Sequence, residues 1–234
     1  MFTLFSHNNN TLSIILETIY KNNYAKNIYI REKCEIVSFK DLELKEYMEL
    51  ISEERINFSY GNPYQTKNIT TEDISILQYN KNDNESKKLI AQIDPKLKKI
   101  VYKLLKIKDE EYSVLIDCSA SISSTSKIGI GSFISSLSSI GPYVELKRFV
   151  SINRNVSIGH HSIVSDFSTL NPGCNIAGNC IIGKGVTIGI GANIIDSIVI
   201  GDNSFIGAGS VVTKNIPSNV VAYGVPAKII RNVQ

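Results

Sequence analysis

Aliphatic residues recur at every sixth position along the second half of this chain. The unbroken series is Ile116, Ile122, Ile128, Ile134, Ile140, Leu146, Ile152, Ile158, Val164, Leu170, Ile176, Ile182, Ile188, Ile194, Ile200, Ile206 and Val212. A sustained period of six fits neither an α-helix nor a simple strand and is typical of hexapeptide repeats that coil into a parallel β-helix. Three hexads complete one triangular coil, so residues 18 positions apart are expected to stack in successive coils, roughly 4.8 Å apart.

The other hexad positions predict a corner after each short strand. The fourth residue after each aliphatic one is almost always small or β-branched, which suits a crowded corner. The third is repeatedly glycine or asparagine, and both tolerate a positive φ. One corner column alternates in charge, as expected of a solvated face in the correct register. It consists of Arg148, Asp166, Lys184 and Asp202.

The segment before the repeat predicts a small α/β domain. Strand patterns occur at 2–6, 27–30 and 74–79, and helical patterns occur at 11–22, 42–55 and 85–108. The first strand, helix and second strand make a Rossmann-like βαβ start. Pro95 must open or break the last of these helices.

The repeat fails after Val212, at the segment 214–217. Since Pro217 cannot continue a hydrogen-bonded ladder, we expect the coil to end there. The tail is expected to fold back as a loop and a short helix that caps the open end. The predicted domains are therefore 1–112 (small α/β domain), 113–216 (hexapeptide-repeat β-helix) and 217–234 (C-terminal capping tail).

Composition excludes several classes of protein. A hydrophobic content of 43% with 20% charged residues excludes a disordered or fibrous chain. The net charge of +3 is too small to indicate a nucleic-acid partner, although an anionic small ligand fits it. The four cysteines form no C-x-x-C pair and are interpreted as reduced packing residues. Neither a signal peptide nor a membrane span is expected, which makes the cytoplasm the default location.

Two of the three histidines, His160 and His161, lie side by side in one predicted corner. His160 should project outward, while His161 takes the place of a left-handed glycine or asparagine, a conformation in which histidine is enriched. One coil above His160 the register places Gly178, whose backbone N–H is open beside the imidazole, so a base meets an oxyanion donor. An equally good interpretation is that both histidines are merely tolerated at this corner and have no catalytic role. No metal is expected, because the third histidine, His7, lies far upstream.

At this point the sequence resembles a known family. The stretch Asn155–Asn179, with Gly207–Lys214 and Gly224–Ala227, is similar to the sugar acetyltransferases related to the sialic acid O-acetyltransferase NeuD. The family includes N-acetyltransferases of nucleotide-linked 4-amino sugars used for surface polysaccharides such as O-antigen. The resemblance implies a left-handed β-helix, a homotrimer with sites between subunits, acetyl-CoA as co-substrate, His160 as base and Gly178 as oxyanion donor.

The resemblance also implies where acetyl-CoA binds, toward the C-terminal end of the coils. The expected contacts are Thr169, Gly178, Gly207, Gly209, Lys214, Gly224, Pro226 and Lys228, with Arg231 as a further basic residue. A structural capping role for these glycines is about equally favoured.

The chain departs from the family's pattern in three places. His161 stands where relatives usually have an acidic residue, so His160 must be oriented by His161, by Asp166 or by a neighbouring subunit. Thr169 stands where relatives often have a second histidine near the thioester. The glycine-rich turn after the first strand, which lets a nucleotide approach the backbone, is replaced by asparagines. The residues expected to bind the nucleotide sugar there are His7, Asn8, Asn9, Asn10 and Glu32.

The resemblance therefore implies an acetyl-CoA-dependent N-acetyltransferase that acts on a nucleotide-linked amino sugar of the 4-amino-4,6-dideoxy type, with 1–112 as the substrate-binding domain and 113–216 as the acyltransferase domain. The amine attacks the thioester directly, with no acyl-enzyme. One alternative is O-acetylation of a sialic-acid-like sugar, which the altered turn favours. The other is a trimeric scaffold that retains the coil and has lost the chemistry.

Overall fold

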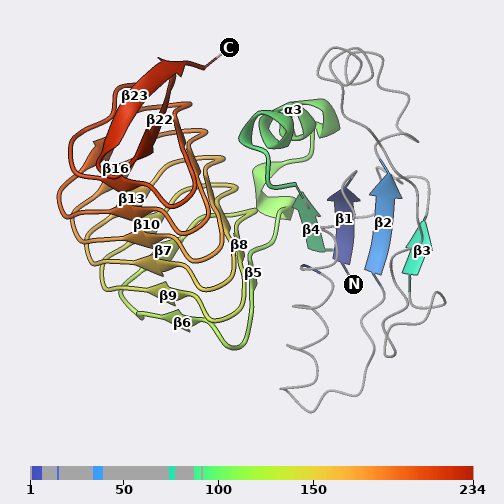
Figure 1. The fold of residues 1–234 in the computed structure, drawn as a ribbon. Coiled ribbons are helices and arrows are strands. Elements are labelled where there is room, and N and C mark those ends of the chain that lie inside the picture. The colour runs from blue at the N-terminus through green and yellow to red at the C-terminus, as the bar shows by residue number, and fades with distance from the viewer. Residues whose placement is uncertain are drawn as a thin grey trace.

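The described part of the chain contains a parallel sheet near the N-terminus, then a helix, and then a long stack of coils (Figure 1). The computed structural model describes residues 2–6, 15, 34–38, 74–76, 87–90 and 92–233. The predicted helix at 42–55 and the predicted strand at 27–30 lie outside these residues. Of the predicted helix at 11–22, only Ile15 is described, and it is helical and buried.

The N-terminal sheet has four parallel strands in the order β3-β2-β1-β4. They are β1 (Phe2–Ser6), β2 (Cys34–Ser38), β3 (Ile74–Ile76) and β4 (Lys87–Ile90). β1 and β3 confirm predicted strands, whereas β2 was not predicted. This order is that of the first strands in a doubly wound sheet. Because the connections lie outside the described residues, the Rossmann-like assignment stays a prediction.

The helix predicted over 85–108 is wrong in its first part. Residues 87–90 form β4 beside β1, with Leu89 and Ile90 buried. The helix α3 spans Pro95–Leu105 and is capped by Asp94, whose side chain accepts the Leu97 N–H at 2.9 Å. Pro95 therefore opens the helix, because a proline at the first helical position has no N–H to leave unpaired.

The repeat forms a left-handed parallel β-helix of about six turns. Each hexad contributes one two-residue strand that ends on the predicted aliphatic residue. The strands are β5 (Leu115–Ile116), β6 (Ser121–Ile122), β7 (Lys127–Ile128), β8 (Phe133–Ile134), β9 (Ser139–Ile140), β10 (Glu145–Leu146), β11 (Ser151–Ile152), β12 (Ser157–Ile158), β13 (Ile163–Val164), β14 (Thr169–Leu170), β15 (Asn175–Ile176), β16 (Ile181–Ile182), β17 (Thr187–Ile188), β18 (Asn193–Ile194), β19 (Val199–Ile200), β20 (Phe205–Ile206) and β21 (Val211–Val212).

These strands build three walls, which we name by their sheets. The five-stranded wall contains β7, β10, β13, β16 and β19, and the six-stranded wall contains β6, β9, β12, β15, β18 and β21. The eight-stranded wall runs from β5 through β20 to β22 and β23. Strands pair with those one coil away, as in Ile158↔Ile176, which confirms the 18-residue register.

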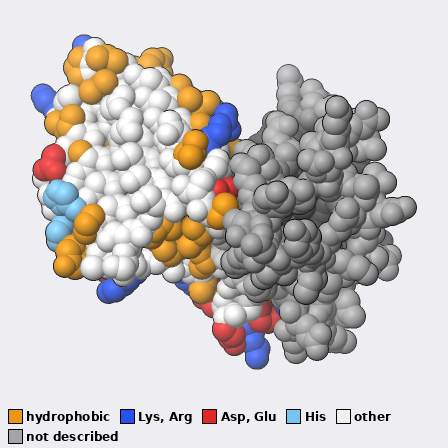
Figure 2. Space-filling view, turned by 90° about the horizontal axis from the view of Figure 1, so that it is seen from below, with side chains coloured by type: hydrophobic (Ala, Val, Ile, Leu, Met, Phe, Trp, Pro, Cys, Tyr) orange, Lys and Arg blue, Asp and Glu red, His pale blue; other side chains and the backbone are white. Residues whose placement is uncertain are grey.

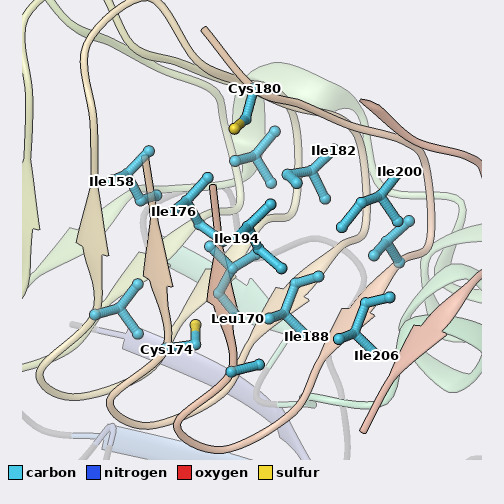
Figure 3. Packing of buried hydrophobic residues seen from close by; sticks show 14 of the residues in the cluster. Ile158, Leu170, Cys174, Ile176, Cys180, Ile182, Ile188, Ile194, Ile200 and Ile206 are labelled. Carbon is cyan, nitrogen blue, oxygen red and sulfur yellow. The ribbon is translucent and has the colours of Figure 1, made fainter. Parts of the chain in front are cut away.

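The aliphatic column fills the interior of the coils. Every member from Ile134 to Val212 is buried, and the first three are half-buried at the N-terminal end. Cys174 and Cys180 pack into the same core (Figure 3). The packing interpretation therefore holds for these two cysteines and is wrong for Cys118, which is exposed.

Buried serines at the fourth hexad position join successive corners. Ser162 donates its hydroxyl to the Ala177 carbonyl at 3.0 Å and accepts the Cys180 N–H at 3.1 Å. Ser168 makes the same pair of bonds in the next corner, to the residues 15 and 18 positions further on. A residue chosen for its small size thus also satisfies two backbone groups that would otherwise be buried without partners.

The C-terminal tail corrects two expectations. It forms β22 (Val220–Gly224) and β23 (Ala227–Asn232), a hairpin instead of a helix, and β22 extends the eight-stranded wall by pairing with β20. The coil therefore continues past Pro217. Pro217 is tolerated because the N–H that it lacks would point to a further coil, and the described residues form no coil there. The equivalent N–H one coil below, that of Gly201, donates to the Ile216 carbonyl.

Helix α3 and the turn η3 (Asp109–Glu111) lie against the eight-stranded wall. Lys98, with 1% of its surface exposed, donates to the Phe149 carbonyl and to Ser151 Oγ, each at 2.8 Å. The rings of Tyr102 and Phe149 are 4.8 Å apart. Phe149 has a φ of 56°, an unusual value for a bulky residue, and this corner conformation directs its ring toward α3.

Candidate active site

His160 lies at an exposed corner between the six-stranded and five-stranded walls, immediately after β12. The column through it reads Pro142, His160, Gly178 and Asp196 in successive coils. Backbone bonds fix this order, because the N–H groups of residues 161, 179 and 197 donate to the carbonyls of residues 142, 160 and 178. Both neighbouring histidines are exposed, and Figure 2 shows them at the edge of the coils beside acidic and apolar side chains. The outward projection predicted for His160 agrees with this position.

The imidazole of His160 leans over Gly178 in the next coil. A Cβ placed on Gly178 would lie 2.7 Å from Cε1 and 2.8 Å from Nε2 of His160, so only glycine leaves room for the ring in this position. Within the described part of the chain, the Gly178 N–H donates to no protein acceptor. An exposed nitrogen base therefore lies against a residue whose backbone N–H is free to donate, and acyl transfer requires both kinds of group.

Gly159 keeps that donor accessible from the coil below. A Cβ on Gly159 would stand 2.6 Å from the backbone nitrogen of Gly178, closer than a Cβ atom approaches in real structures. Ser162 fixes the same two corners from the inside, through its bonds to residues 177 and 180. The spacing between base and donor is thus set by buried contacts.

His161 is the residue that contacts His160. Its φ of 59° confirms the left-handed corner predicted for it, and its ring stacks on Tyr143 with centroids 4.9 Å apart. The two Nδ1 atoms of the histidine pair are 3.1 Å apart. Only one of these two Nδ1 atoms can carry a proton in this contact. If it is His160, its Nε2 keeps a lone pair toward Gly178, the tautomer that a general base needs.

Asp166, the other candidate for orienting His160, faces a different corner. Its carboxylate accepts the Arg148 guanidinium at 3.0 Å and the Arg148 N–H at 2.9 Å. These bonds help to hold the pKa of Arg148 above its usual range. Within one chain, the orientation of His160 therefore falls to His161 and not to Asp166.

Thr169 is also placed differently from expectation. Only 2% of its surface is exposed, its hydroxyl donates to the Ile93 carbonyl, and it accepts from Lys98 at 3.3 Å. It lies beneath α3 on the eight-stranded wall. A contact between this side chain and acetyl-CoA is therefore excluded in this arrangement.

The other residues expected to bind acetyl-CoA divide between two corners and the tail. Gly207 is buried, donates to the Ala222 carbonyl at 2.9 Å, and has no room for a Cβ against Tyr223. For Gly207, a structural capping role therefore fits better than a contact with acetyl-CoA. Gly209, with its φ of 65°, and Lys214 are exposed on the two corners that border the six-stranded wall at its last coil.

The remaining three lie in or beside the tail hairpin. Gly224 donates to Ser210 Oγ at 3.2 Å, and Pro226 and Lys228 are exposed. Arg231 is exposed in β23 as well. Of the residues expected to bind acetyl-CoA, Lys214 lies in the same corner column as His160, three coils above it. The residues expected to bind nucleotide, His7, Asn8, Asn9, Asn10 and Glu32, lie outside the described residues.

Buried cysteines near the site are unsuited to carry an acyl group. The Cys180 thiol lies inside the corner of Gly178, with Sγ 3.5 Å from the Gly178 carbonyl oxygen. Burial raises its pKa, and burial raises the pKa of Cys174 to about 12. Since the thiolate is the reactive form, neither residue is a nucleophile at neutral pH.

Asp196 is a site residue that the prediction left out. A Cβ on Gly178 would lie 3.0 Å from its Oδ1, on the side of the glycine opposite the coil of His160. The 18-residue register already placed Asp196 in this column, so the signal was present in the sequence.

Among the described residues, no group of three or more His, Cys, Asp or Glu side chains is arranged to hold a metal ion. No helix in the described part of the chain is long and apolar enough to cross a membrane.

Comparison with known proteins supports this fold. A family model described as bacterial transferase hexapeptide (six repeats) matches residues 179–214. No curated protein sequence matches the chain significantly.

Solved structures match over almost the whole chain. A single-residue variant of perosamine N-acetyltransferase from Caulobacter crescentus, in complex with CoA and GDP-perosamine, gives a TM-score of 0.72 at 19% identity, covering 99% of this chain and 97% of that one. The acetyltransferase domain of PglB from Neisseria gonorrhoeae, in complex with acetyl coenzyme A, gives 0.69 at 20%, covering 98% of each chain. WeeI from Acinetobacter baumannii gives 0.64 at 18%, covering 98% and 99%. At this level of identity the likeness establishes the fold.

Proposed function

We propose that this chain is an acyltransferase that moves an acyl group directly from a thioester to an acceptor. The observation that carries the proposal is that His160 Nε2 lies 2.8 Å from the Cβ position of Gly178, a residue whose N–H donates to no acceptor among the described residues. His160 removes a proton from the nucleophile, and the Gly178 N–H stabilises the oxyanion of the tetrahedral intermediate. The inert thiols of Cys174 and Cys180 support direct transfer.

The particular activity we propose is N-acetylation of a nucleotide-linked amino sugar of the 4-amino-4,6-dideoxy type by acetyl-CoA. The support comes from the similarity in fold, along nearly the full chain, to acetyltransferases crystallised with CoA and GDP-perosamine or with acetyl coenzyme A. A β-helix preceded by a parallel sheet is common to the chains compared over this length. The product would serve in the synthesis of a surface glycan precursor.

The reaction follows from the geometry of the corner. The neutral amine attacks the thioester carbonyl carbon, a C–N bond forms, and the carbonyl oxygen becomes an oxyanion beside the Gly178 N–H. The amine proton passes to Nε2 of His160. When the intermediate collapses, the C–S bond breaks and His160 returns that proton to the thiolate, which gives the amide and CoA. His161 holds the His160 ring in the tautomer that both steps need.

We further propose that the chain acts as a homotrimer with its sites between subunits. Ile181 and Val199 are 44% and 40% exposed on the five-stranded wall, one coil apart and next to the corner of His160. Ile195, on that corner, is 44% exposed. An apolar stripe beside the catalytic corner suits a subunit contact. Gly209, Lys214, Pro226 and Lys228 would then meet acetyl-CoA at a neighbour's corner.

The test is acetyl-CoA turnover with His160→Ala against a matched control. A panel of dTDP-, UDP- and GDP-linked 4-amino-4,6-dideoxy sugars serves as acceptors, and sugars with a 4-hydroxyl test for O-acetylation. Loss of the base is expected to lower kcat/KM roughly 10²- to 10⁴-fold. Lys184→Ala, a residue at the same hexad position on another corner, should retain full activity.

Three results would contradict the proposal in different ways. Unchanged turnover in His160→Ala would remove the catalytic role of His160. Turnover of the hydroxyl acceptors alone would establish the O-acetyltransferase alternative. Folded protein without turnover on any acceptor would leave the non-catalytic scaffold.

A further inference from the structure

The carboxylate of Asp196 and the imidazole of His160 face each other across the side-chain space of Gly178. The Cβ position of Gly178 lies 3.0 Å from Oδ1 of Asp196 and 2.8 Å from Nε2 of His160, so the two atoms are separated by less than the sum of these distances. One nitrogen atom placed between them would be within hydrogen-bonding distance of both. The corner therefore offers two acceptors on either side of a single small space.

Asp196 does not have the structural role that corner aspartates have elsewhere in this β-helix. Asp166 and Asp202 each use Oδ1 to accept the backbone N–H of the residue one coil below, at 2.9 and 2.8 Å. Asp196 makes no such bond to Gly178. Its Oδ2 accepts the Ser197 hydroxyl at 2.6 Å, and its Oδ1 has only the Asn179 amide, at 3.5 Å.

The charge on Asp196 is also left without a cation. In the part of the chain that the structure describes, no lysine or arginine forms an ion pair with it. The titratable side chains in its column are Lys214, which is exposed one coil above, and His160, which lies two coils below with His161 beside it. An exposed carboxylate held by Ser197, aimed at the catalytic base and unpaired, is suited to bind a cationic group of a ligand.

We infer that Asp196 makes this site selective for an amine acceptor, by binding the ammonium form of the amino sugar against His160. The inference rests on the proposed acyl transfer and names the chemistry of its acceptor. An ammonium group donates one hydrogen bond to Oδ1 of Asp196 and another toward Nε2 of His160. A hydroxyl group carries no charge and gains much less from the carboxylate.

Proton transfer to the base then prepares the nucleophile. One ammonium proton passes to Nε2 of His160 and on to solvent, which leaves the neutral amine with its lone pair facing the thioester. Asp196 keeps its charge throughout and takes no proton. The attack, the second proton transfer to His160 and the release of CoA proceed as described above, so the net reaction consumes the ammonium and releases one proton.

The experiment compares Asp196→Asn with Asp202→Asn, which removes a carboxylate from the neighbouring corner. The probe is whichever of GDP-perosamine and its dTDP- and UDP-linked 4-amino counterparts the wild type acetylates best. We expect Asp196→Asn to lower kcat/KM for this amine roughly 10- to 100-fold, mainly through KM. Asp202→Asn should leave both parameters unchanged.

Binding measured by calorimetry at several pH values distinguishes charge recognition from a structural effect. In the wild type, the affinity for the amino sugar should fall as pH rises through the pKa of the sugar's own amino group, because the ammonium is lost. In Asp196→Asn this dependence should disappear. The 4-hydroxyl analogue should bind both proteins equally at every pH.

The possible failures are distinguishable. If the wild type acetylates no acceptor, the proposed function fails. If the wild type is active and Asp196→Asn keeps its KM and its pH-dependent binding, the role of Asp196 is wrong while the function stands. The role of Asp196 would also be overturned if Asp196→Asn lost affinity equally for the amine and the hydroxyl ligands. The same holds if the variant had a lower melting temperature but bound the amino sugar with unchanged pH dependence.

Discussion

The His160 ring occupies the space in which a side chain of Gly178 would stand, with Nε2 2.8 Å from the Cβ position of that glycine. The two residues are 18 positions apart, one turn of the coil, and the backbone bond from Asn179 to the His160 carbonyl fixes their spacing at 2.9 Å between nitrogen and oxygen. The absence of a side chain in one coil therefore determines where the base of the coil below can point.

Gly178→Ala should separate activity from stability. The new methyl group would meet Cε1 and Nε2 of His160 and Oδ1 of Asp196, all atoms at the ends of exposed side chains that can move away. We expect the melting temperature to change little and kcat to fall about 10²-fold, as for a displaced general base. In a double-mutant cycle with His160→Ala, the glycine change should cost almost nothing once the ring is gone. Additive losses would show that the methyl group acts elsewhere.

His161 should be replaceable by a residue that keeps its acceptor. His161→Ala removes the partner of His160 Nδ1, and we expect kcat/KM to fall about tenfold or more, the value of a hydrogen bond to a charged group. His161→Asn offers an amide oxygen and tolerates the φ of 59°, so it should recover much of the loss. Steady-state kinetics of both variants test this. Equal activity of the two would mean that His161 does not orient the base.

Two serines permit a matched comparison of structure and catalysis. Ser162→Ala and Ser168→Ala each remove a buried hydroxyl that bridges two backbone groups, so each should lower the free energy of unfolding by about 1–3 kcal/mol. Only Ser162 joins the corners of His160 and Gly178. Below the melting temperature, Ser162→Ala alone should lower kcat. Similar activity of both variants would indicate that the corner spacing tolerates this change.

Lys98 should make stability depend on pH. Burial lowers its pKa from 10.5 to about 7, although Asp94 opposes the shift. Between these values the unfolded chain binds a proton that the folded chain has lost, so this contribution to stability rises with pH from about 7 to 10.5 and is smallest below 7.

Lys98→Met abolishes that titration. Urea unfolding of the wild type and of Lys98→Met at several pH values should give a stability difference that changes in favour of the wild type as pH rises from about 7. The exposed neighbour supplies the control, because Lys99→Met should follow the wild type. A difference that stays constant between pH 6 and 10 would show that Lys98 does not titrate in this range.

The accuracy of the sequence prediction depended on whether a signal repeats. The coil, its register and the left-handed corner at His161 were predictable, because each hexad carries the same pattern and errors would have shown as breaks. Residues 87–90 and the tail have no such repetition. At residues 87–90 the helical spacing of a few apolar residues competed with strand pairing to β1, and the pairing prevailed; in the tail, β22 pairs with β20 where a capping helix was expected.

The catalytic corner divides in the same way. Counting residues in the repeat predicted that His160 lies one coil above Pro142 and one coil below Gly178. It could not predict that Thr169 is buried under α3. That contact joins segments more than 70 residues apart, and no local pattern announces it. The bond between Asp166 and Arg148, by contrast, lies in the corner column of alternating charge that the register had placed.

The sequence by itself determined the β-helix and the stacking of His160 on Gly178, because a two-residue strand and a corner in every hexad fix both the coil and its register. The tertiary structure alone decided how the corner works. It turned His160 toward Gly178, set His161 against it, aimed Asp196 into the same space, and covered Thr169 with α3. These are contacts of side-chain rotamers and of distant segments, and packing selects among them where periodicity cannot.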